Sequence, residues 1–467
     1  MMRINTLFTM IAVTLLLLFQ NGSSRGAETE PPVKLTLHPA AQPIPALMYR
    51  LLPSRLDQKP GNAAVHYGKV TAEETRFFSS REILENIVRW QEVPLEELRD
   101  ELVNLPTRGA IEGSIRRGAH CRICDWQLPI GDVPFYGMPL PEVQQTRNFG
   151  RILGARTRMQ IADGEFSDAV ETLQSGYSLG RHVATGETLV NGLVGIAICE
   201  IMSRQVLDFV QQPKAPNLYW ALTMLPRPLI EMNDAVDIEA MSVELSFPEL
   251  RDLQTAVRTP DEWRELFHRV AQEVLEQIGN DDTPEPPSAD ELDQRCKRLL
   301  PVAKEALIAD GITAEAVAAM PMHQIALLYS MRTYHGLLDD AIKYYYMPFP
   351  NAIVGIDTAI LRANREQQEI IPLAELLMPA IKSSRVAMAR NDRRIAVLRV
   401  IEALRIYGAF HDGNLPERLE DIAEAPIPED PVTGLPFEYL RDGNNAVLSG
   451  PTLRDFPLDL EITMVHP

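Results

Sequence analysis

The sequence predicts a mainly helical protein, with a multi-helix body of packed helical hairpins and a small α+β module at its C-terminal end. Ala, Leu and Glu are plentiful, whereas aromatic residues make up only 6% of the 467 residues, a balance that favours helix over sheet. The longest uninterrupted helical pattern, residues 147–210, predicts three packed helices. In the first two, hydrophobic residues recur at steps of three and four, whereas the third, Leu189–Met202, is apolar almost all round and predicts a buried helix. A tight turn with Gly164 as its C-cap separates the first two of these three predicted helices.

The N-terminal residues have the three-part plan of a secretory signal peptide. A short positive region at Met1–Arg3 precedes the apolar stretch Leu7–Phe19, and small residues at Ser24 and Gly26 suit cleavage after Gly26. We therefore expect a signal peptide at residues 1–26 and a periplasmic or extracellular (exported) mature chain with no stable membrane span. An uncleaved signal anchor is the alternative, although the apolar stretch is shorter than the roughly 18 residues that a membrane-spanning helix needs.

Changes in composition divide the mature chain into three parts. Residues 27–45 are polar and proline-rich and predict an extended lead-in, residues 46–392 predict the helical domain, and residues 393–467 predict the small α+β module. Within the helical domain we expect an irregular loop at 106–141, which is rich in glycine and proline. We also expect an exposed acidic, proline-rich linker at 279–290.

Two short segments near the C-terminus alternate in polarity as strands do. They are Phe437–Tyr439 and Ala446–Ser449, and the turn-forming residues Asp442–Asn445 lie between them. Alternating segments joined by a turn of this composition are typical of a β-hairpin. The sequence therefore predicts an antiparallel pair of strands inside the α+β module.

The charge balance and the missing motifs restrict the functional class. Acidic residues outnumber basic ones by 64 to 45, which gives a formal net charge of −19. Such a surface repels phosphate backbones, so we expect no nucleic-acid partner. The sequence contains no His-Glu-x-x-His zinc motif, no Walker loop and no dinucleotide-binding glycine motif. We therefore expect no metal or cofactor. As partner we expect an unknown protein or a component of the cell envelope.

Cys121 and Cys124 are the only clustered cysteines in the chain. They do not fit covalent haem attachment, because Asp125 rather than histidine follows Cys124. They do not fit a structural zinc site either, because Cys199 and Cys296 are single and distant. A thioredoxin-like motif opens a helix after a strand, whereas this pair leads into a segment rich in proline and glycine. A local disulfide or two free thiols remain, and an exported protein favours the disulfide.

His335, Asp339 and Asp340 form a candidate polar site on the predicted helix Met322–Met347. His335 and Asp339 are four residues apart and therefore share one helix face. There they can act as metal ligands or as an acid–base pair. An ordinary helix surface with an intrahelical hydrogen bond is the alternative, and the sequence identifies no third ligand. His182 lies at the end of the second central helix. At this position a positive charge on its side chain interacts favourably with the helix dipole, and we expect that role for it.

The segment Ala155–Leu179 resembles one hairpin of a tetratricopeptide repeat. It contains the motif Ala162-Asp163-Gly164-Glu165-Phe166-Ser167-Asp168-Ala169, and in that family a glycine, an aromatic residue and an alanine occur at these offsets. No second copy follows at a period of about 34 residues. The resemblance therefore implies a single TPR-like hairpin and no repeat array.

Further stretches resemble a group of exported, mostly helical proteins of planctomycete bacteria that have no assigned function. These stretches are Tyr49–Pro53, Pro60–Ala64, Cys124–Trp126, Gly180–Val183, Leu193–Ile198 and Met320–Tyr334. The part from Asp392-Arg393-Arg394 to Asp430-Pro431-Val432-Thr433-Gly434-Leu435-Pro436-Phe437 also resembles the soluble region of type II secretion pseudopilins. The pseudopilin methylation motif and its Asp-rich calcium tail are missing here. The resemblance therefore implies a compartment and a fold, but neither pilus assembly nor catalytic residues.

Together these features favour an exported, non-enzymatic binding or scaffolding protein of the periplasm or cell surface. The alternative is a periplasmic hydrolase or metal-dependent enzyme that uses the His335/Asp339/Asp340 face or the His120–Asp125 loop. The two classes differ in one spatial feature. An enzyme requires that two of these polar groups converge in one concave pocket.

Overall fold

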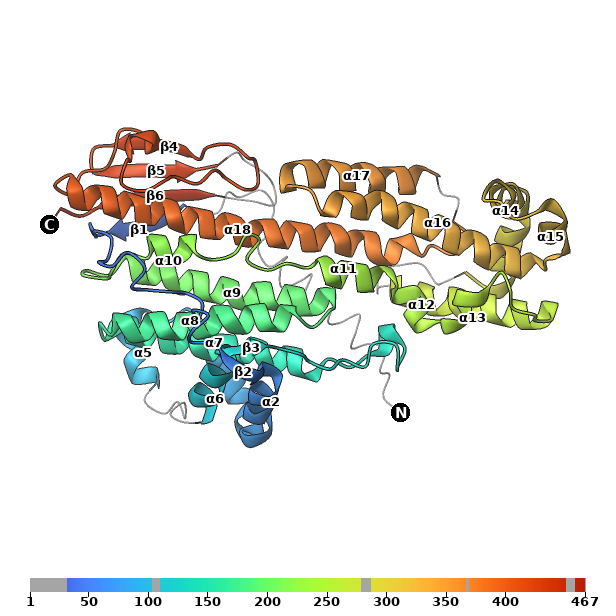
Figure 1. Cartoon of the computed structure of the whole chain (residues 1–467), viewed down its shortest axis with the longest axis horizontal. Coiled ribbons are helices and arrows are strands. Elements are labelled where there is room, and N and C mark those ends of the chain that lie inside the picture. Colours follow the sequence, from blue (N-terminus) through green and yellow to red (C-terminus); the bar gives the residue numbers. More distant parts are fainter. Residues whose placement is uncertain (1–31, 103–109, 279–286, 367–368, 451–457, 467) are drawn as a thin grey trace. The chain divides into compact units, whose positions relative to one another are not determined.

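The computed structural model describes residues 32–102, 110–278, 287–366, 369–450 and 458–466 (Figure 1). The chain is mainly helical and has a small four-stranded sheet built mostly from C-terminal residues, so the predicted fold class is confirmed. It forms two compact units, which we name the main unit and the inserted unit. The main unit contains residues 27–128, 140–232 and 386–467, and the inserted unit contains residues 129–139 and 233–385.

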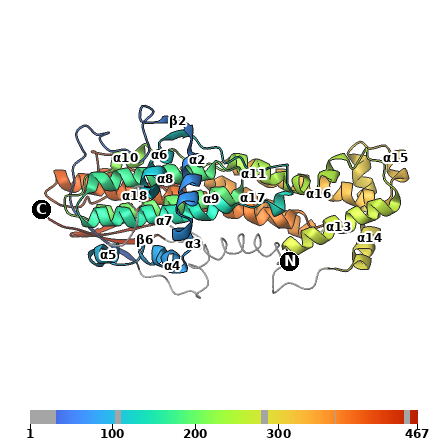
Figure 2. The same cartoon turned by 90° about the horizontal axis from the view of Figure 1, so that it is seen from below.

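Three long helices form the core of the main unit. They are α7 (Pro141–Ala162), α8 (Phe166–Ala184) and α9 (Leu189–Val210), and they lie side by side in both views (Figures 1 and 2). Gly164 has a φ of +74° in the turn between α7 and α8, and the side chain of Thr188 caps the start of α9. The predicted three helices and their glycine turn are therefore confirmed.

Helices α8 and α9 approach each other closely at two glycines. A Cβ atom on Gly195 would lie 2.5 Å from the carbonyl oxygen of Gly180, and a Cβ atom on Gly180 would lie 2.8 Å from the carbonyl oxygen of Gly195. Because the opposing atoms belong to the backbone, they cannot rotate away as the end of a side chain can. The two helices therefore need glycine at both positions.

Shorter helices of the main unit are α2 (Ala63–Glu73), α3 (Thr75–Ser79), α4 (Arg81–Arg89), α5 (Leu95–Leu102), α6 (Ala110–Ala119) and α10 (Tyr219–Thr223). Helix α6 and the strand β3 (Cys121–Ile123) interrupt the segment 106–141, so the predicted irregular loop is wrong over these two elements. Ile115 of α6 is fully buried. A Cβ atom on Gly118 would lie 2.6 Å from the Tyr67 ring. In an isolated segment, glycines favour a loop. In this fold they allow α6 to pack tightly on α2 instead.

The sheet of the main unit has the strand order β1-β6-β5-β4. Its strands are β1 (Val33–Leu37), β4 (Glu438–Asp442), β5 (Asn445–Ser449) and β6 (Asp459–Met464). β4 and β5 pair antiparallel with Asp442 opposite Asn445, which confirms the predicted hairpin. β1 comes from the predicted extended lead-in and pairs in parallel with β6, with Val33 opposite Leu460. This parallel pair was not predicted from the sequence.

Helix α18 (Ala374–Phe410) runs through both units. Its residues 374–385 belong to the inserted unit, and its residues 386–410 belong to the main unit. In the main unit the sheet lies beside the end of α18 (Figure 1), where Met464 of β6 comes close to Gly408. The C-terminal strands are thus attached to the helix that precedes them.

Two buried ion pairs hold the main-unit part of α18. Glu402 and Arg405 have no exposed side-chain surface, and Arg405 Nη1 lies 2.9 Å from Glu402 Oε2. Arg393 Nη2 lies 2.9 Å from Asp430 Oδ2, and the exposed fractions of these side chains are 5% and 0%. Asp430 begins the Asp-Pro-x-x-Gly-x-Pro-Phe motif, so the second pair fastens that motif to the helix.

The inserted unit consists of helices. They are η1 (Phe135–Gly137), α11 (Asn233–Ala240), α12 (Ser242–Ser246), η2 (Pro248–Asp252), α13 (Pro260–Ile278), α14 (Ala289–Ala309), α15 (Ala314–Ala319), α16 (Met322–Tyr345) and α17 (Phe349–Glu366). Ser288 and Glu291 form a capping box at the start of α14. Residues 279–286 of the predicted acidic linker lie outside the described part of the chain. Helix α16 agrees with the predicted helix, whereas α17 was not predicted.

The predicted signal peptide, residues 1–26, also lies outside the described part of the chain. None of the described helices combines the length and the apolar composition that crossing a membrane requires. Export therefore stays a prediction of the sequence.

Candidate functional site

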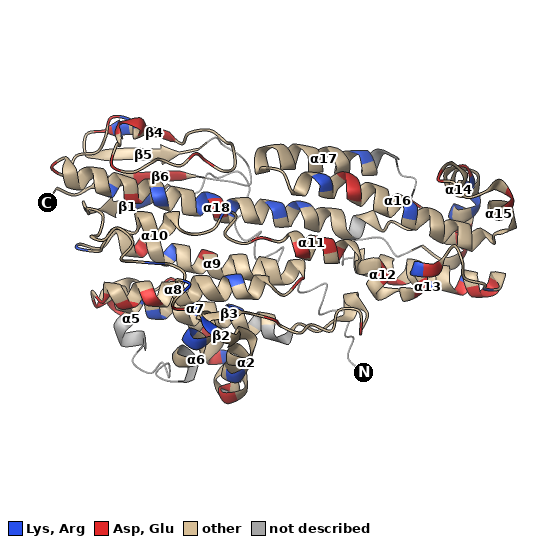
Figure 3. Ribbon diagram, viewed as in Figure 1, with Lys and Arg blue, Asp and Glu red and all other residues tan. Residues whose placement is uncertain are grey.

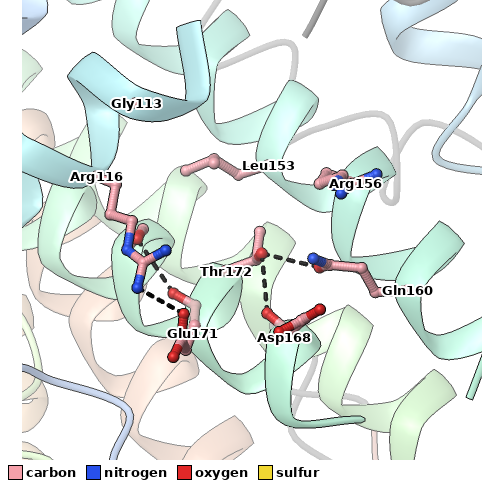
Figure 4. A pocket seen from close by; sticks show the side chains of 9 residues that line it. Gly113, Arg116, Leu153, Arg156, Gln160, Asp168, Glu171 and Thr172 are labelled. Carbon is pink, nitrogen blue, oxygen red and sulfur yellow. Dashed lines mark hydrogen bonds and ion pairs between the residues drawn. The ribbon is translucent and has the colours of Figure 1, made fainter. Parts of the chain in front are cut away.

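Two cavities in the described part of the main unit differ in how their charges are balanced. The first has a volume of about 380 Å³ and lies between α6, α7 and α8 (Figure 4). Arg116 Nη2 pairs with Glu171 Oε2 at 2.7 Å, and the Thr172 hydroxyl donates a hydrogen bond to Gln160 Oε1 at 2.8 Å. Two arginines and two acidic residues line this cavity. It is therefore a balanced polar site that does not select ligands of one charge.

The second cavity, which we name the arginine pocket, has a volume of about 540 Å³. Arg50 and Arg55 come from the segment before β2 (Lys59–Asn62), Arg122 comes from β3, and Arg181 comes from α8. No carboxylate side chain lines the pocket. Figure 3 shows basic residues beside the short strands β2 and β3. Four arginines thus surround one cavity of a chain in which acidic residues outnumber basic ones by 64 to 45.

None of the four arginines is ion-paired within the part of the chain that the structure describes. Arg50 Nη1 approaches the sulfur of Met224 at 4.0 Å, a weak contact. Asp57, which follows the first two arginines, does not line the pocket and accepts a hydrogen bond of 2.5 Å from the Ser54 hydroxyl. The Ser54 hydrogen bond and the charge of Arg50 both contribute to lowering the pKa of Asp57, but none of the residues that line the pocket is acidic, so its lining has a net positive charge.

A buried hydroxyl and a neutral histidine belong to the same wall of α8. Ser178 is 3% exposed, and its Oγ has no hydrogen-bond partner among the described residues. Nδ1 of His182 forms a hydrogen bond of 2.9 Å with the Tyr67 hydroxyl. Burial and the neighbouring positive charge of Arg181 lower the pKa of His182 to about 4. The predicted interaction of a charged His182 with the helix dipole is therefore wrong, because the imidazole is neutral at physiological pH.

Apolar residues also line the arginine pocket. Leu51, Leu52 and Pro53 lie beside the arginines in the chain, and Met224 and Leu225 come from the end of the α10 segment. A cavity lined by both guanidinium groups and aliphatic side chains suits a ligand that has an anionic group and an apolar part.

The loop with Cys121 and Cys124 forms part of the pocket and is held by hydrogen bonds. The Asn62 side chain accepts from the backbone N–H of Asp125 at 2.9 Å and donates to its carbonyl oxygen at 2.7 Å. The Thr185 hydroxyl donates to the Cys124 carbonyl oxygen at 2.8 Å. These contacts anchor the loop to α2 and α8 without a covalent bond.

Cys121 and Cys124 are buried free thiols in this structure, and the disulfide between them stays a prediction. Burial raises the pKa of both thiols, that of Cys124 to about 12. The thiolate, not the thiol, is the nucleophile and the metal ligand. Neutral thiols in this position therefore do not favour thiol chemistry by the His120–Asp125 loop.

In the structure, His335 and Asp340 of the predicted polar site on α16 have different partners, and the hydrogen bond to Glu244 and the charge of Asp339 contribute to raising the pKa of His335. Nε2 of His335 lies 2.6 Å from Oε1 of Glu244 rather than bonding to Asp339. Asp340 pairs with Lys343 at 2.6 Å and with Arg362 at 2.8 Å. His335 and Asp340 therefore have no partner in common among these contacts. Among the described residues, one other group, in the inserted unit, brings three possible metal ligands within 4.8 Å of one another.

The comparisons with known proteins give no further information on this site. No family model matches the chain, and neither a curated protein nor a solved structure was found to be similar to it. The functional argument therefore rests on the geometry and charge of the residues themselves.

His182 makes the main unit sensitive to acid. Its pKa is about 4 in the folded chain and 6.5 in an unfolded one. Between these values the unfolded chain binds a proton that the folded chain does not, so the free energy of unfolding falls as the pH drops. We expect the wild type to lose about 2 kcal/mol more than His182→Asn between pH 7 and pH 5, as measured by urea unfolding. Equal losses in the two proteins would contradict this expectation, because all other titrating groups are common to both.

Proposed function

We propose that this chain is an exported binding protein that takes a small organic anion into the arginine pocket. One observation supports the proposal above all. Four arginines without ion-pair partners among the described residues line a cavity that has no carboxylate, in a chain with a net charge of −19. The export part of the proposal rests on the N-terminal sequence.

Electrostatics favour binding of an anion in the arginine pocket over binding elsewhere on the acidic surface of the chain. Guanidinium groups bind carboxylates and phosphates with two parallel hydrogen bonds. A concave wall also concentrates the potential of charges of one sign. The acidic exterior repels anions, so the local reversal of charge at Arg50, Arg55, Arg122 and Arg181 requires its own explanation. Binding of an anion offsets the repulsion among these four cations.

The size of the pocket and its apolar lining residues restrict the ligand class further. A volume of about 540 Å³ is that of a site for a small molecule. Leu51, Leu52 and Leu225 offer no hydrogen bonds to a polar ligand body. We therefore favour an organic phosphate or carboxylate with a hydrocarbon or aromatic part over an inorganic anion.

Calorimetric titration of the full-length chain tests the proposal. Phenyl phosphate should bind more tightly than inorganic phosphate, and added salt should weaken both. Arg181→Gln should raise the Kd for phenyl phosphate about tenfold or more, because a hydrogen bond to a charged group is worth about 1.5–3 kcal/mol. Arg181 is chosen for this change because it lies on α8, a long helix of the main-unit core that packs closely on α9.

Arg81→Gln is the matched control. Arg81 lies on α4 of the same unit, its side chain is 92% exposed, and it pairs with Glu85 away from the pocket. This variant should bind phenyl phosphate as the wild type does. The proposal fails if neither anion binds at millimolar concentration, or if Arg181→Gln and Arg81→Gln change the Kd equally.

A further inference from the structure

Three side chains of the inserted unit converge on one carboxylate oxygen. His268 comes from α13, Asp293 from α14 and His323 from α16. Nε2 of His268 lies 3.0 Å from Asp293 Oδ1, and Nε2 of His323 lies 2.8 Å from the same oxygen. The three possible ligand atoms all lie within 4.8 Å of one another. Residues up to 55 positions apart in the chain are thus brought together by the packing of three helices.

The cluster is largely shielded from solvent. His323 is 8% exposed, and the side chains of His268 and Asp293 are 21% and 15% exposed. The ring of Phe267, which is fully buried, lies 5.3 Å from the His323 ring. An apolar wall behind imidazole ligands slows exchange with water and strengthens the attraction between a cation and its ligands.

We propose that His268, Asp293 and His323 form a binding site for a divalent transition-metal ion of the zinc type. Neutral imidazole nitrogen and carboxylate oxygen are ligands that such ions prefer. Two ligand atoms that lie about 3 Å apart subtend roughly 90° at an ion about 2.1 Å from each. The distances of 2.8 and 3.0 Å are therefore compatible with two such ligand pairs on one ion. Three protein ligands leave at least one position for water.

The second oxygen of the carboxylate is already held. Arg264 Nη2 lies 3.1 Å from Asp293 Oδ2, so it orients the carboxylate and leaves Oδ1 directed at the two imidazoles. A residue that holds a metal ligand in this way affects affinity without touching the ion. Arg264 is therefore a positioning residue in the proposed site.

The competing interpretation is a closed hydrogen-bond cluster in which both imidazoles donate to Asp293 Oδ1. That arrangement accounts for the same distances without an ion, and it predicts no specific metal affinity. The site lies in the inserted unit, so its test is independent of the arginine pocket. No metal site was expected from the sequence, because the three ligands are not close enough in the chain to form a recognisable motif.

The experiment uses the full-length chain after removal of metal with a chelator. Titration with Zn²⁺ should give one tight site per chain, and Co²⁺ should give visible absorption bands that report coordination by nitrogen and oxygen. Asp293→Asn and His323→Gln should weaken Zn²⁺ binding by more than the roughly 10–100-fold that loss of an outer-shell partner costs. Arg264→Gln should fall within that range. Asp293→Asn preserves the shape of the side chain, so a folding defect in His323→Gln alone does not prevent the test.

His335→Gln is the matched control, because His335 lies on the same helix as His323 and pairs with Glu244. This variant should bind Zn²⁺ and Co²⁺ as the wild type does. The proposal is overturned if the wild type shows no cobalt absorption bands. It is also overturned if Asp293→Asn binds Zn²⁺ as tightly as the His335→Gln control.

Discussion

Arg405→Leu is expected to lower the free energy of unfolding of the main unit by about 3–5 kcal/mol, because it leaves the buried carboxylate of Glu402 without its partner. Neither side chain has any exposed surface, and their charged atoms lie 2.9 Å apart. Arg405 also donates hydrogen bonds to the carbonyl oxygens of Ala215, at 2.7 Å, and His38, at 3.0 Å. The substitution therefore removes one ion pair and two contacts that connect α18 to distant segments.

The remaining carboxylate determines how the variant responds to pH. Burial already raises the pKa of Glu402 in the wild type, where the charge of Arg405 opposes that effect. Without the guanidinium the pKa rises further, and protonation removes the buried charge. The defect of Arg405→Leu should therefore be smaller at pH 5 than at pH 7.

Urea unfolding followed by tryptophan fluorescence measures this change, since Trp90, Trp126 and Trp220 lie in the main unit. In the double variant Arg405→Leu/Glu402→Gln, the amide oxygen can still accept the hydrogen bond from the backbone N–H of Leu218, which is 2.8 Å long in the wild type. This variant should recover part of the lost stability. A loss below about 1 kcal/mol in the single variant would show that the pair contributes little.

Gly195→Val is expected to destabilise the packing of α8 on α9 by more than the 1–3 kcal/mol that an ordinary overpacked core position costs. The first added carbon would lie 2.5 Å from the Gly180 carbonyl oxygen and 3.0 Å from the Ala184 Cβ. Relief requires the two helices to separate, because the nearest atom belongs to the backbone. The loss of stability should appear as a lower urea midpoint.

Gly68→Ala is the control for this substitution. Gly68 lies within α2 of the same unit, and an added Cβ would meet no atom within 4 Å. There alanine should stabilise the helix by about 0.5–1 kcal/mol, since it lacks the conformational freedom of glycine. If both variants shifted the midpoint in the same direction, close approach of the helices would not explain the effect.

The sequence predicted those elements whose pattern is local. The apolar stripes of α7 and α8 and the nearly continuous apolar run of α9 lie within each helix, and the turn at Asp442–Asn445 fixes the β4–β5 hairpin within a few residues. β1 escaped prediction because it is a short strand whose partner, β6, lies more than 420 residues away. β6, which also pairs with β5, was not predicted either. Helix α17 begins at Phe349-Pro350, where proline suggested a helix end but instead occupies the first turn.

The arginine pocket could not be predicted for a different reason. Arg50, Arg55, Arg122 and Arg181 come from three segments of the chain, and each alone has the pattern of a solvent-exposed side chain. Only the fold shows that they share a cavity without a carboxylate. The sequence did single out the His120–Asp125 loop, and its Cys121, Arg122 and Cys124 do line the pocket.

The parallel pairing of β1 with β6 has a consequence for synthesis of the chain. In the described sheet, β1 has β6 as its neighbour and lies at the edge. The ribosome makes β1 among the first residues and β6 at 459–464, after the whole inserted unit. Closing a loop of this length is entropically costly and slow. The main unit therefore completes its sheet only after translation has reached the last strand, and until then β1 is a strand without a partner.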